Sequence, residues 1–302
     1  MLNFFPQFRN SIQLSCLIDD IIIEGLDVFQ LLGQGNVKSC KIKEKNWRRR
    51  RGMEVTLLGS GTAIPDAQRG SPGIAVSVDG WNIFLDCGSG SLYRAARFGV
   101  PVDQVDCVFL SHLHPDHSGD LVPLLFALRN PELERQKDLT VLGPEGLHEF
   151  FGNLEKVYGD WVQPEGYRLD IQSLNTGKRS FGTWRIRVCP VNHGPPALAC
   201  EITDSQGRRL VYSGDTDYCP PLAAFARDAD LVIMECSFPE GTEHTGHLTP
   251  SKAGKMAREA GCRKLLLTHF YPACKGQDLL TPCRRFFDGP VLLAEDGLKL
   301  SV

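Results

Sequence analysis

The sequence predicts an α/β fold made of two packed sheets with helices on their outer faces, an αββα sandwich. Short apolar runs typical of buried strands alternate with helical segments between residues 53 and 302. One pattern also occurs twice, because residues 108–112 (VFLSH) and 265–269 (LLLTH) both place a hydroxyl residue and a histidine after an apolar run. Two similar halves that each carry a histidine at a strand end indicate two sheets that meet at a common site.

The composition is that of a globular protein with a sizeable core, since 42% of the 302 residues are hydrophobic and 23% are charged. No apolar run approaches the ~18 residues of a membrane span, and no secretory signal is visible. The eleven cysteines are scattered, several lie inside apolar runs, and none forms a Cys-x-x-Cys pair. This usage favours reduced thiols, so we expect a cytoplasmic protein without a membrane segment.

Residues 1–52 form an N-terminal extension that differs from the rest of the chain. They carry nine Lys and Arg against five Asp and Glu, whereas residues 53–302 carry 24 against 31, a balance of −7. We interpret the extension as a disordered tail or as translated upstream DNA, with Met53 as the natural start, because purine-rich ribosome-binding DNA encodes runs such as Arg48 to Gly52. The acidic balance of residues 53–302 suits a long polyanion poorly, although a local basic patch is compatible with it.

The first half of the chain begins with strands expected at residues 54–58, 73–78 and 82–86. Gly59 and Gly61 follow the first strand, but a dinucleotide-binding loop needs a third glycine, and Pro65 prevents the helix that such a loop begins. Asp86 ends the third strand beside a turn of small residues. It can therefore cap the helix expected through Arg97, or its carboxylate can serve a functional site.

The richest stretch of the sequence follows the apolar run 106–110 and holds His112, His114, Asp116 and His117. Alternate side chains of an extended chain point the same way, so His112 and His114 can bind one ion. Pro115 then bends the chain and lets Asp116 and His117 face a second ion nearby. Imidazole and carboxylate ligands suit zinc, and also manganese or iron. One histidine alone is usually a packed or surface residue, but four ligand-type residues at this spacing predict a metal site.

Helices and strands continue to the end of the chain. Helices are expected at residues 120–128, 146–158, 220–227 and 250–260, and His148 has an ordinary surface or packing role in the second of these. Residues 167–174, 184–191, 198–203 and 209–212 alternate as antiparallel strands do, and residues 139–142, 230–235, 264–267 and 290–294 predict further strands. His193, Asp215 and His269 each follow one of these strands, where sites are commonly built. Individually each could be a turn residue, a cap or a packed side chain.

The pattern His-x-His-x-Asp-His after a buried strand resembles the metallo-β-lactamase superfamily, and the resemblance extends from Met53 to the end of the chain. It implies an αββα sandwich of the metallo-β-lactamase type and a site with two divalent ions. It further implies that His112, His114 and His193 bind one ion, that Asp116, His117 and His269 bind the other, and that Asp215 bridges them. In the superfamily, the residue at Asp86 orients the metal-binding loop from behind the ligands.

Within the superfamily, the chain is similar to the ribonuclease Z branch and its phosphodiesterase relatives. The matching segments are residues 57–65, 213–216 and 247–270, and the resemblance implies that His247 lies near the scissile phosphate without binding metal. The alternative for His247 is a surface loop histidine, and the nearby His244 lacks the motif match. An aspartate at position 215, where lactamases can carry a thiolate, argues against an antibiotic hydrolase.

The expected function is therefore that of a dinuclear metal-dependent hydrolase in which a bridging hydroxide attacks small or nucleotide-like phosphodiesters. Asp116 or Asp215 would position the nucleophile and His247 would assist the leaving oxygen. Two alternatives remain, a tRNA 3′-end endonuclease and a lactone, thioester or sulfate ester hydrolase. Short ribonucleases Z usually carry a long tRNA-binding arm between the residues that match His193 and Asp215. These two residues are only 22 positions apart here, which disfavours tRNA as the substrate; a homodimer is compatible with the resemblance.

Overall fold

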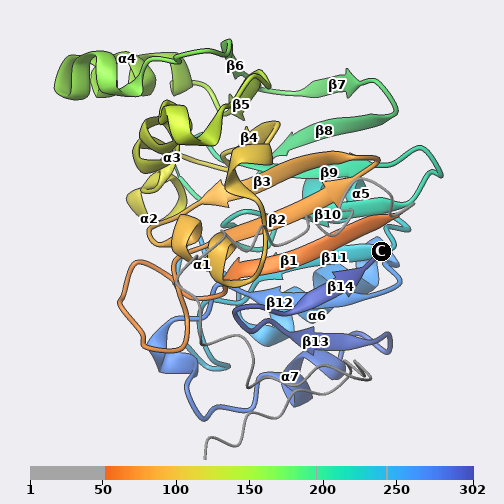
Figure 1. Cartoon of the computed structure of the whole chain (residues 1–302). Coiled ribbons are helices and arrows are strands. Elements are labelled where there is room, and N and C mark those ends of the chain that lie inside the picture. Colours follow the sequence, from red (N-terminus) through yellow and green to blue (C-terminus); the bar gives the residue numbers. More distant parts are fainter. Residues whose placement is uncertain (1–51, 195, 243) are drawn as a thin grey trace, which may run out of the picture. The chain divides into compact units, whose positions relative to one another are not determined.

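The computed structural model describes residues 52–302 except Pro195 and Glu243, and the predictions for residues 1–51 lie outside this range. The described residues form two seven-stranded sheets (Figure 1). In spatial order, the first sheet contains β14 (Lys299–Ser301), β1 (Met53–Gly59), β2 (Gly73–Val78), β3 (Trp81–Cys87), β4 (Cys107–Phe109), β5 (Leu139–Gly143) and β6 (Leu169–Ser173). The second contains β13 (Val291–Leu293), β12 (Leu265–Thr268), β11 (Leu231–Glu235), β10 (Arg209–Tyr212), β9 (Leu198–Thr203), β8 (Trp184–Pro190) and β7 (Gly177–Phe181).

Alternate side chains along the strands of the first sheet point to its two opposite faces and belong to two separate hydrophobic cores. Val55 and Leu57 of β1 belong to the cluster that fills the space between the sheets, whereas Leu58 packs on the opposite face with Phe84 of β3. That outer face is covered by α1 (Ser91–Arg97), α3 (Leu121–Leu128) and α4 (Leu147–Tyr158). The helices α5 (Pro220–Phe225), α6 (Pro250–Ala260) and α7 (Leu280–Arg284) pack with the second sheet. The predicted αββα sandwich is confirmed.

Each sheet contains a run of parallel strands, and the loops that follow these strands lie at one edge of the sheet. The neighbours β3, β4, β5 and β6 run parallel, as do β10, β11, β12 and β13, so their carboxyl ends lie along one edge of each sheet. The short helix α2 (Pro115–Ser118) follows β4 at this edge. Ligand sites of parallel sheets commonly form outside the carboxyl ends of the strands.

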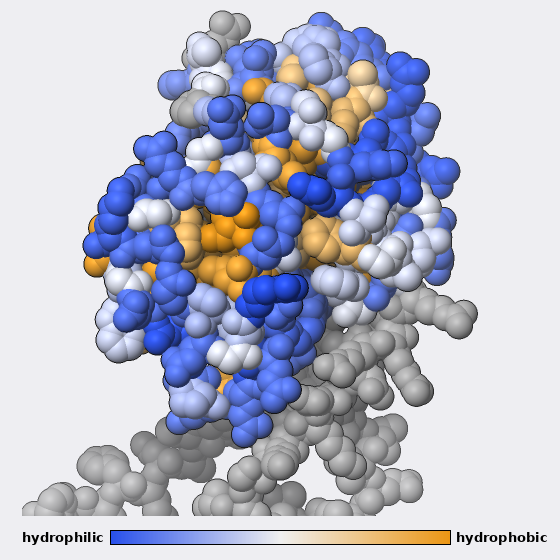
Figure 2. Space-filling model, turned by 90° about the horizontal axis from the view of Figure 1, so that it is seen from above, coloured by the Kyte–Doolittle hydropathy of each residue, from blue (hydrophilic) through white to orange (hydrophobic). Residues whose placement is uncertain are grey.

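Two details differ from the sequence prediction. The strand expected at residues 167–174 is β6, which pairs in parallel with β5 in the first sheet instead of continuing the antiparallel run. Apolar alternation looks the same in both orientations, so the sequence could not specify the partner. The edge strands β7 and β14 were not predicted, because their residues are mostly exposed and polar. Figure 2, seen from the end where β6 and β7 lie, shows apolar side chains between hydrophilic rims, in keeping with the partly buried Ile171 and Phe181.

No helix within residues 52–302, apart from Pro195 and Glu243, combines the length and apolar character needed to cross a bilayer.

Candidate metal centre

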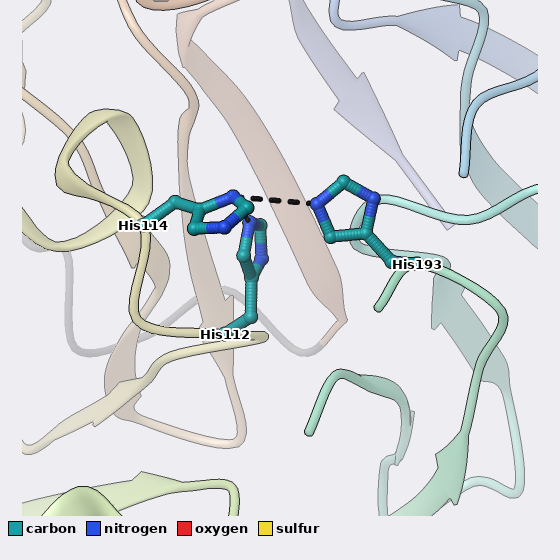
Figure 3. Close-up of side chains that lie close together, drawn as sticks. All are labelled: His112, His114 and His193. Carbon is teal, nitrogen blue, oxygen red and sulfur yellow. Dashed lines mark hydrogen bonds between the residues drawn. The ribbon is translucent and has the colours of Figure 1, made fainter. Parts of the chain in front are cut away.

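Three imidazoles converge from two loops at the carboxyl edge of the sheets (Figure 3). His112 and His114 follow β4, and His193 follows β8. His112 Nε2 lies 3.0 Å from His114 Nδ1, which lies 3.3 Å from His193 Nε2. Ligand atoms about 2.0–2.1 Å from a tetrahedral zinc ion would lie about 3.3 Å apart, so this spacing suits one ion.

A second group of donors lies beside the first. The Nε2 atoms of His117 and His269 are 3.2 Å apart. Asp116 Oδ2 lies 3.8 Å from His117 Nε2 and 3.7 Å from His269 Nε2. Asp116 is partly exposed, whereas His117 and His269 are buried, so this group is open to solvent on the side of Asp116.

Asp215 lies between the two groups and faces both. Its Oδ2 is 3.9 Å from His112 Nε2, 3.8 Å from His193 Nε2 and 3.3 Å from His117 Nε2, while its Oδ1 is 3.4 Å from His269 Nε2. Within the described residues, Oδ1 is buried and accepts no hydrogen bond. Buried carboxylate oxygens normally have a partner, and a cation would provide one here. The donor set therefore fits divalent metal ions.

The hydrogen bonds behind the rings determine which nitrogens face the centre. His193 Nδ1 donates to the backbone carbonyl of Gly246 at 2.9 Å, which leaves Nε2 with a free lone pair. The Ser237 hydroxyl donates to Glu235 Oε2 at 2.6 Å and accepts from His269 Nδ1 at 2.9 Å. His269 Nδ1 therefore carries the proton, which leaves the lone pair of His269 Nε2 free to bind a metal ion. Outer hydrogen bonds of this kind fix the tautomer of metal-binding histidines.

Asp86 supports the centre from the buried side. Its carboxylate accepts hydrogen bonds from Ser111 N at 2.7 Å, Ser111 Oγ at 2.8 Å and Tyr212 Oη at 2.6 Å, and it contacts His117 Nδ1 at 2.7 Å. The residue before α1 is Gly90, so Asp86 does not cap that helix. Its φ of 58° is unusual for a residue other than glycine, and such strain is commonly found at functional sites. Ser111 and Tyr212 were not identified as site residues from the sequence.

Glu235 is the main residue that the sequence reasoning missed. It ends β11, is only 1% exposed, and accepts hydrogen bonds from the backbone of Thr216 (2.8 Å), Ser237 (3.2 Å) and Leu248 (3.1 Å). His247 Nδ1 lies 2.9 Å from its Oε1. One signal was present, because Glu235 ends an apolar run in the same way that Asp86 does.

His247 lies beside both donor groups. Its ring centroid is 4.9 Å from that of His193 and 5.9 Å from that of His269, and its side chain is 15% exposed. The donor atoms of His193, Asp215 and His247 also lie within 4.8 Å of one another, so the distances alone do not separate a ligand from a proton donor. His244 stacks on Phe238 with centroids 4.0 Å apart and is exposed, and His148 is exposed on α4.

The protonation states of His112 and Asp215 suit metal binding, whereas a metal ion would have to displace a proton from His117. Burial lowers the pKa of His117, but the charges of Asp215 and Asp86 outweigh it and raise that pKa well above its ordinary value. Burial, reinforced by the neighbouring His117, lowers the pKa of His112 to about 2, so this imidazole is neutral. Burial would raise the pKa of Asp215, but the charges of His117 and His269 outweigh it and hold that pKa well below its ordinary value. Burial also opposes the charged form of His247, yet the hydrogen bond and charge of Glu235 raise its pKa overall. Metal ligands of these types must be neutral imidazoles and ionised carboxylates.

Residues 81–270 match the family described as "Beta-lactamase superfamily domain". The chain belongs to the metallo-β-lactamase superfamily. It is 31% identical to the probable metallo-hydrolase YhfI of Bacillus subtilis, over 81% of this chain and 98% of that protein. It is also 31% identical to a ribonuclease Z of Mycolicibacterium gilvum, over 75% of this chain and 87% of that protein.

Solved structures of the superfamily agree with this assignment. The crystal structure of Bacillus subtilis YhfI matches with a TM-score of 0.72 at 28% identity, covering 83% of this chain and all of that one. The human short-form tRNase Z matches with a TM-score of 0.67 at 22% identity, covering 82% and 99% of the two chains, which shows a shared fold. This metallo-β-lactamase superfamily member is a metal-dependent hydrolase of the ribonuclease Z-like type, and divalent metal ions are its cofactors.

Proposed function

We propose that the chain hydrolyses small or nucleotide-like phosphodiesters with two divalent metal ions, zinc being the first choice and manganese or iron the alternatives. The proposal rests on the position of Asp215, because its two carboxylate oxygens face two adjacent groups of metal-binding side chains. In this proposal one ion is bound by His112, His114 and His193. The other ion is bound by Asp116, His117 and His269, and Asp215 binds both ions. Divalent ions held there would supply Lewis acidity at the phosphoryl group.

Side chains of the protein would orient the attacking water and donate a proton to the leaving oxygen. Asp116 is partly exposed at the centre and can orient a nucleophilic water by accepting its hydrogen bond. His247, held through Nδ1 by Glu235, can donate a proton to the leaving oxygen, since its pKa is raised. General-acid help of this kind contributes roughly 10²–10⁴-fold. Asp86 keeps His117 and the loop at Ser111 in place from behind.

A small substrate is favoured by the segment between His193 and Asp215. Its described residues form β9, β10 and the turn between them, which pair antiparallel in the second sheet. A protruding tRNA-binding arm has no place in this segment.

The second candidate is a ribonuclease Z-type endonuclease that acts at tRNA 3′ ends. It is favoured by the relative from Mycolicibacterium gilvum, which is named ribonuclease Z. A lactone, thioester or sulfate ester hydrolase is a weaker candidate, since it rests only on the versatility of the fold.

A cytoplasmic location agrees with the nine free cysteines among the described residues.

One experiment separates these functions. Metal-free protein is reconstituted with zinc, manganese or iron and tested on bis-p-nitrophenyl phosphate, a lactone and a precursor tRNA. We expect two ions per chain and rapid turnover of the phosphodiester. Turnover of the lactone or accurate tRNA cleavage, with the phosphodiester untouched, would reject the proposal.

A further inference from the structure

A basic hollow lies on the outer face of the second sheet, over β7, β8, β9 and β10. Its volume is about 620 Å³, and it is lined by five cationic side chains against two carboxylates. The cations are Lys178, Arg185, Arg187, Arg209 and Arg227, and the carboxylates are Glu201 and Asp228. None of these residues takes part in the metal centre described above.

The register of the strands places these cations on one surface. Along β8, Trp184 and Ile186 are buried in the core, so Arg185 and Arg187 point to the outer face. Arg187 lies opposite Lys178 of β7 and Glu201 of β9. The hollow is therefore built by the alternation of β8 and by its two neighbours.

Glu201 holds two of the guanidinium groups in fixed positions. This carboxylate is 1% exposed, and it accepts hydrogen bonds from Arg187 Nε and Nη2, both at 2.8 Å, and from Arg209 Nε at 2.8 Å. The Arg187 guanidinium also lies 4.8 Å from the ring centroid of Phe225. One carboxylate shared between two guanidiniums leaves a positive charge at the floor of the hollow.

Among the described residues, the other three cations have no acidic partner. Lys178, Arg185 and Arg227 are exposed, and no carboxylate of the described residues lies within ion-pair distance of them. Arginine forks match phosphate oxygens particularly well. Of the side chains that line the hollow, Glu201 alone is buried, so the hollow is shallow. Small-molecule sites enclose most of their ligand, and a shallow basic surface suits an extended strand instead.

We propose that this hollow binds the phosphodiester backbone of a nucleic-acid strand. The site lies at the end of β8 remote from His193, since Arg185 precedes the last residue of this strand, Pro190, by five residues or about 17 Å of extended chain. Binding there does not require that the strand be cleaved. The competing explanation is that charges on an edge strand only prevent sheet-to-sheet aggregation, and it predicts no affinity for phosphate.

The test compares two charge-reversed variants of the full chain. The first carries Lys178→Glu, Arg185→Glu and Arg227→Glu. The matched control carries Lys156→Glu, Arg284→Glu and Arg285→Glu, which changes the charge equally at exposed positions elsewhere. Fluorescence anisotropy measures binding of labelled oligouridine and oligothymidine of about 16 nucleotides over a range of salt concentrations. The N-terminal basic run is the same in every protein, so the difference between variants reports the hollow.

For three phosphate contacts, a plot of the logarithm of the association constant of the unmodified chain against the logarithm of the salt concentration should have a slope of about −2. The hollow variant should bind at least about tenfold more weakly with a shallower slope, while the control stays within about twofold. Melting temperatures check that all proteins fold, and Arg185→Gln replaces the triple variant if it does not. Equal affinities of hollow and control variants, absence of binding by the unmodified chain, or displacement of the strand by equimolar ATP would overturn the proposal.

Discussion

Asp215 provides the sharpest test of the metal centre, because it is the residue whose two oxygens face both donor groups. In the two-ion proposal, replacing it with alanine removes one negative charge at both ions. A pair of unit charges about 4 Å apart interacts with about 4 kcal/mol at an effective dielectric constant of about 20. Since 1.4 kcal/mol corresponds to tenfold, we expect the dissociation constants of the metals to rise by about two to three orders of magnitude, with turnover near background.

The measurement is metal content by mass spectrometry after dialysis against a graded series of chelator concentrations, followed by turnover of bis-p-nitrophenyl phosphate. Asp217→Ala is the matched control, because Asp217 is close in sequence but pairs with Lys252 at 2.8 Å. The control should retain both ions. If Asp215→Ala also retained two ions and full turnover, the assignment of this residue, and with it the two-ion proposal, would be wrong.

Three further predictions concern catalysis. His247→Ala should keep its metals and its KM but lose roughly two to four orders of magnitude in kcat; loss of metal would make His247 a ligand, and an unchanged kcat would make it a surface residue. Glu235→Gln removes the charge that raises the pKa of His247, so the decline of kcat at alkaline pH should begin at lower pH; an unmoved profile would separate Glu235 from proton transfer. Precursor tRNA should not be cleaved accurately at nanomolar enzyme and physiological salt; accurate 3′-end cleavage would promote the ribonuclease Z function.

The sequence predicted those parts of the site that follow directly from local pattern. His112 and His269 end apolar runs, and the structure places them at strand ends 107–109 and 265–268 in different sheets. Glu235 also ends an apolar run, but this pattern does not reveal its role, because its hydrogen-bond donors Thr216 and Leu248 come from segments 19 residues before it and 13 after it. A side chain whose function depends on such distant contacts is visible only once the chain is folded.

The basic hollow was missed for a related reason. The strand β7 reads GKRSF, and all of its residues except Phe181 are exposed, so no apolar alternation indicates a strand there. Without β7, Lys178 cannot be placed opposite Arg187. The parallel pairing of β6 was unpredictable in the same sense, because the partner of a strand, and not its own residues, decides the orientation.

Net charge is therefore a weak guide to polyanion binding in this protein. The balance of −7 in residues 53–302 includes carboxylates such as Asp116 and Asp215, which we assign to the metal ions. Charges separated by more than about 8 Å are largely screened at physiological ionic strength. Affinity in the hollow is then decided by the unpaired Lys178, Arg185 and Arg227, and not by the domain average. The segment between His193 and Asp215 is a separate argument against tRNA as the substrate, because it has no place for a protruding tRNA-binding arm. Acidic domains can hold a nucleic-acid strand locally and still cleave only small phosphodiesters.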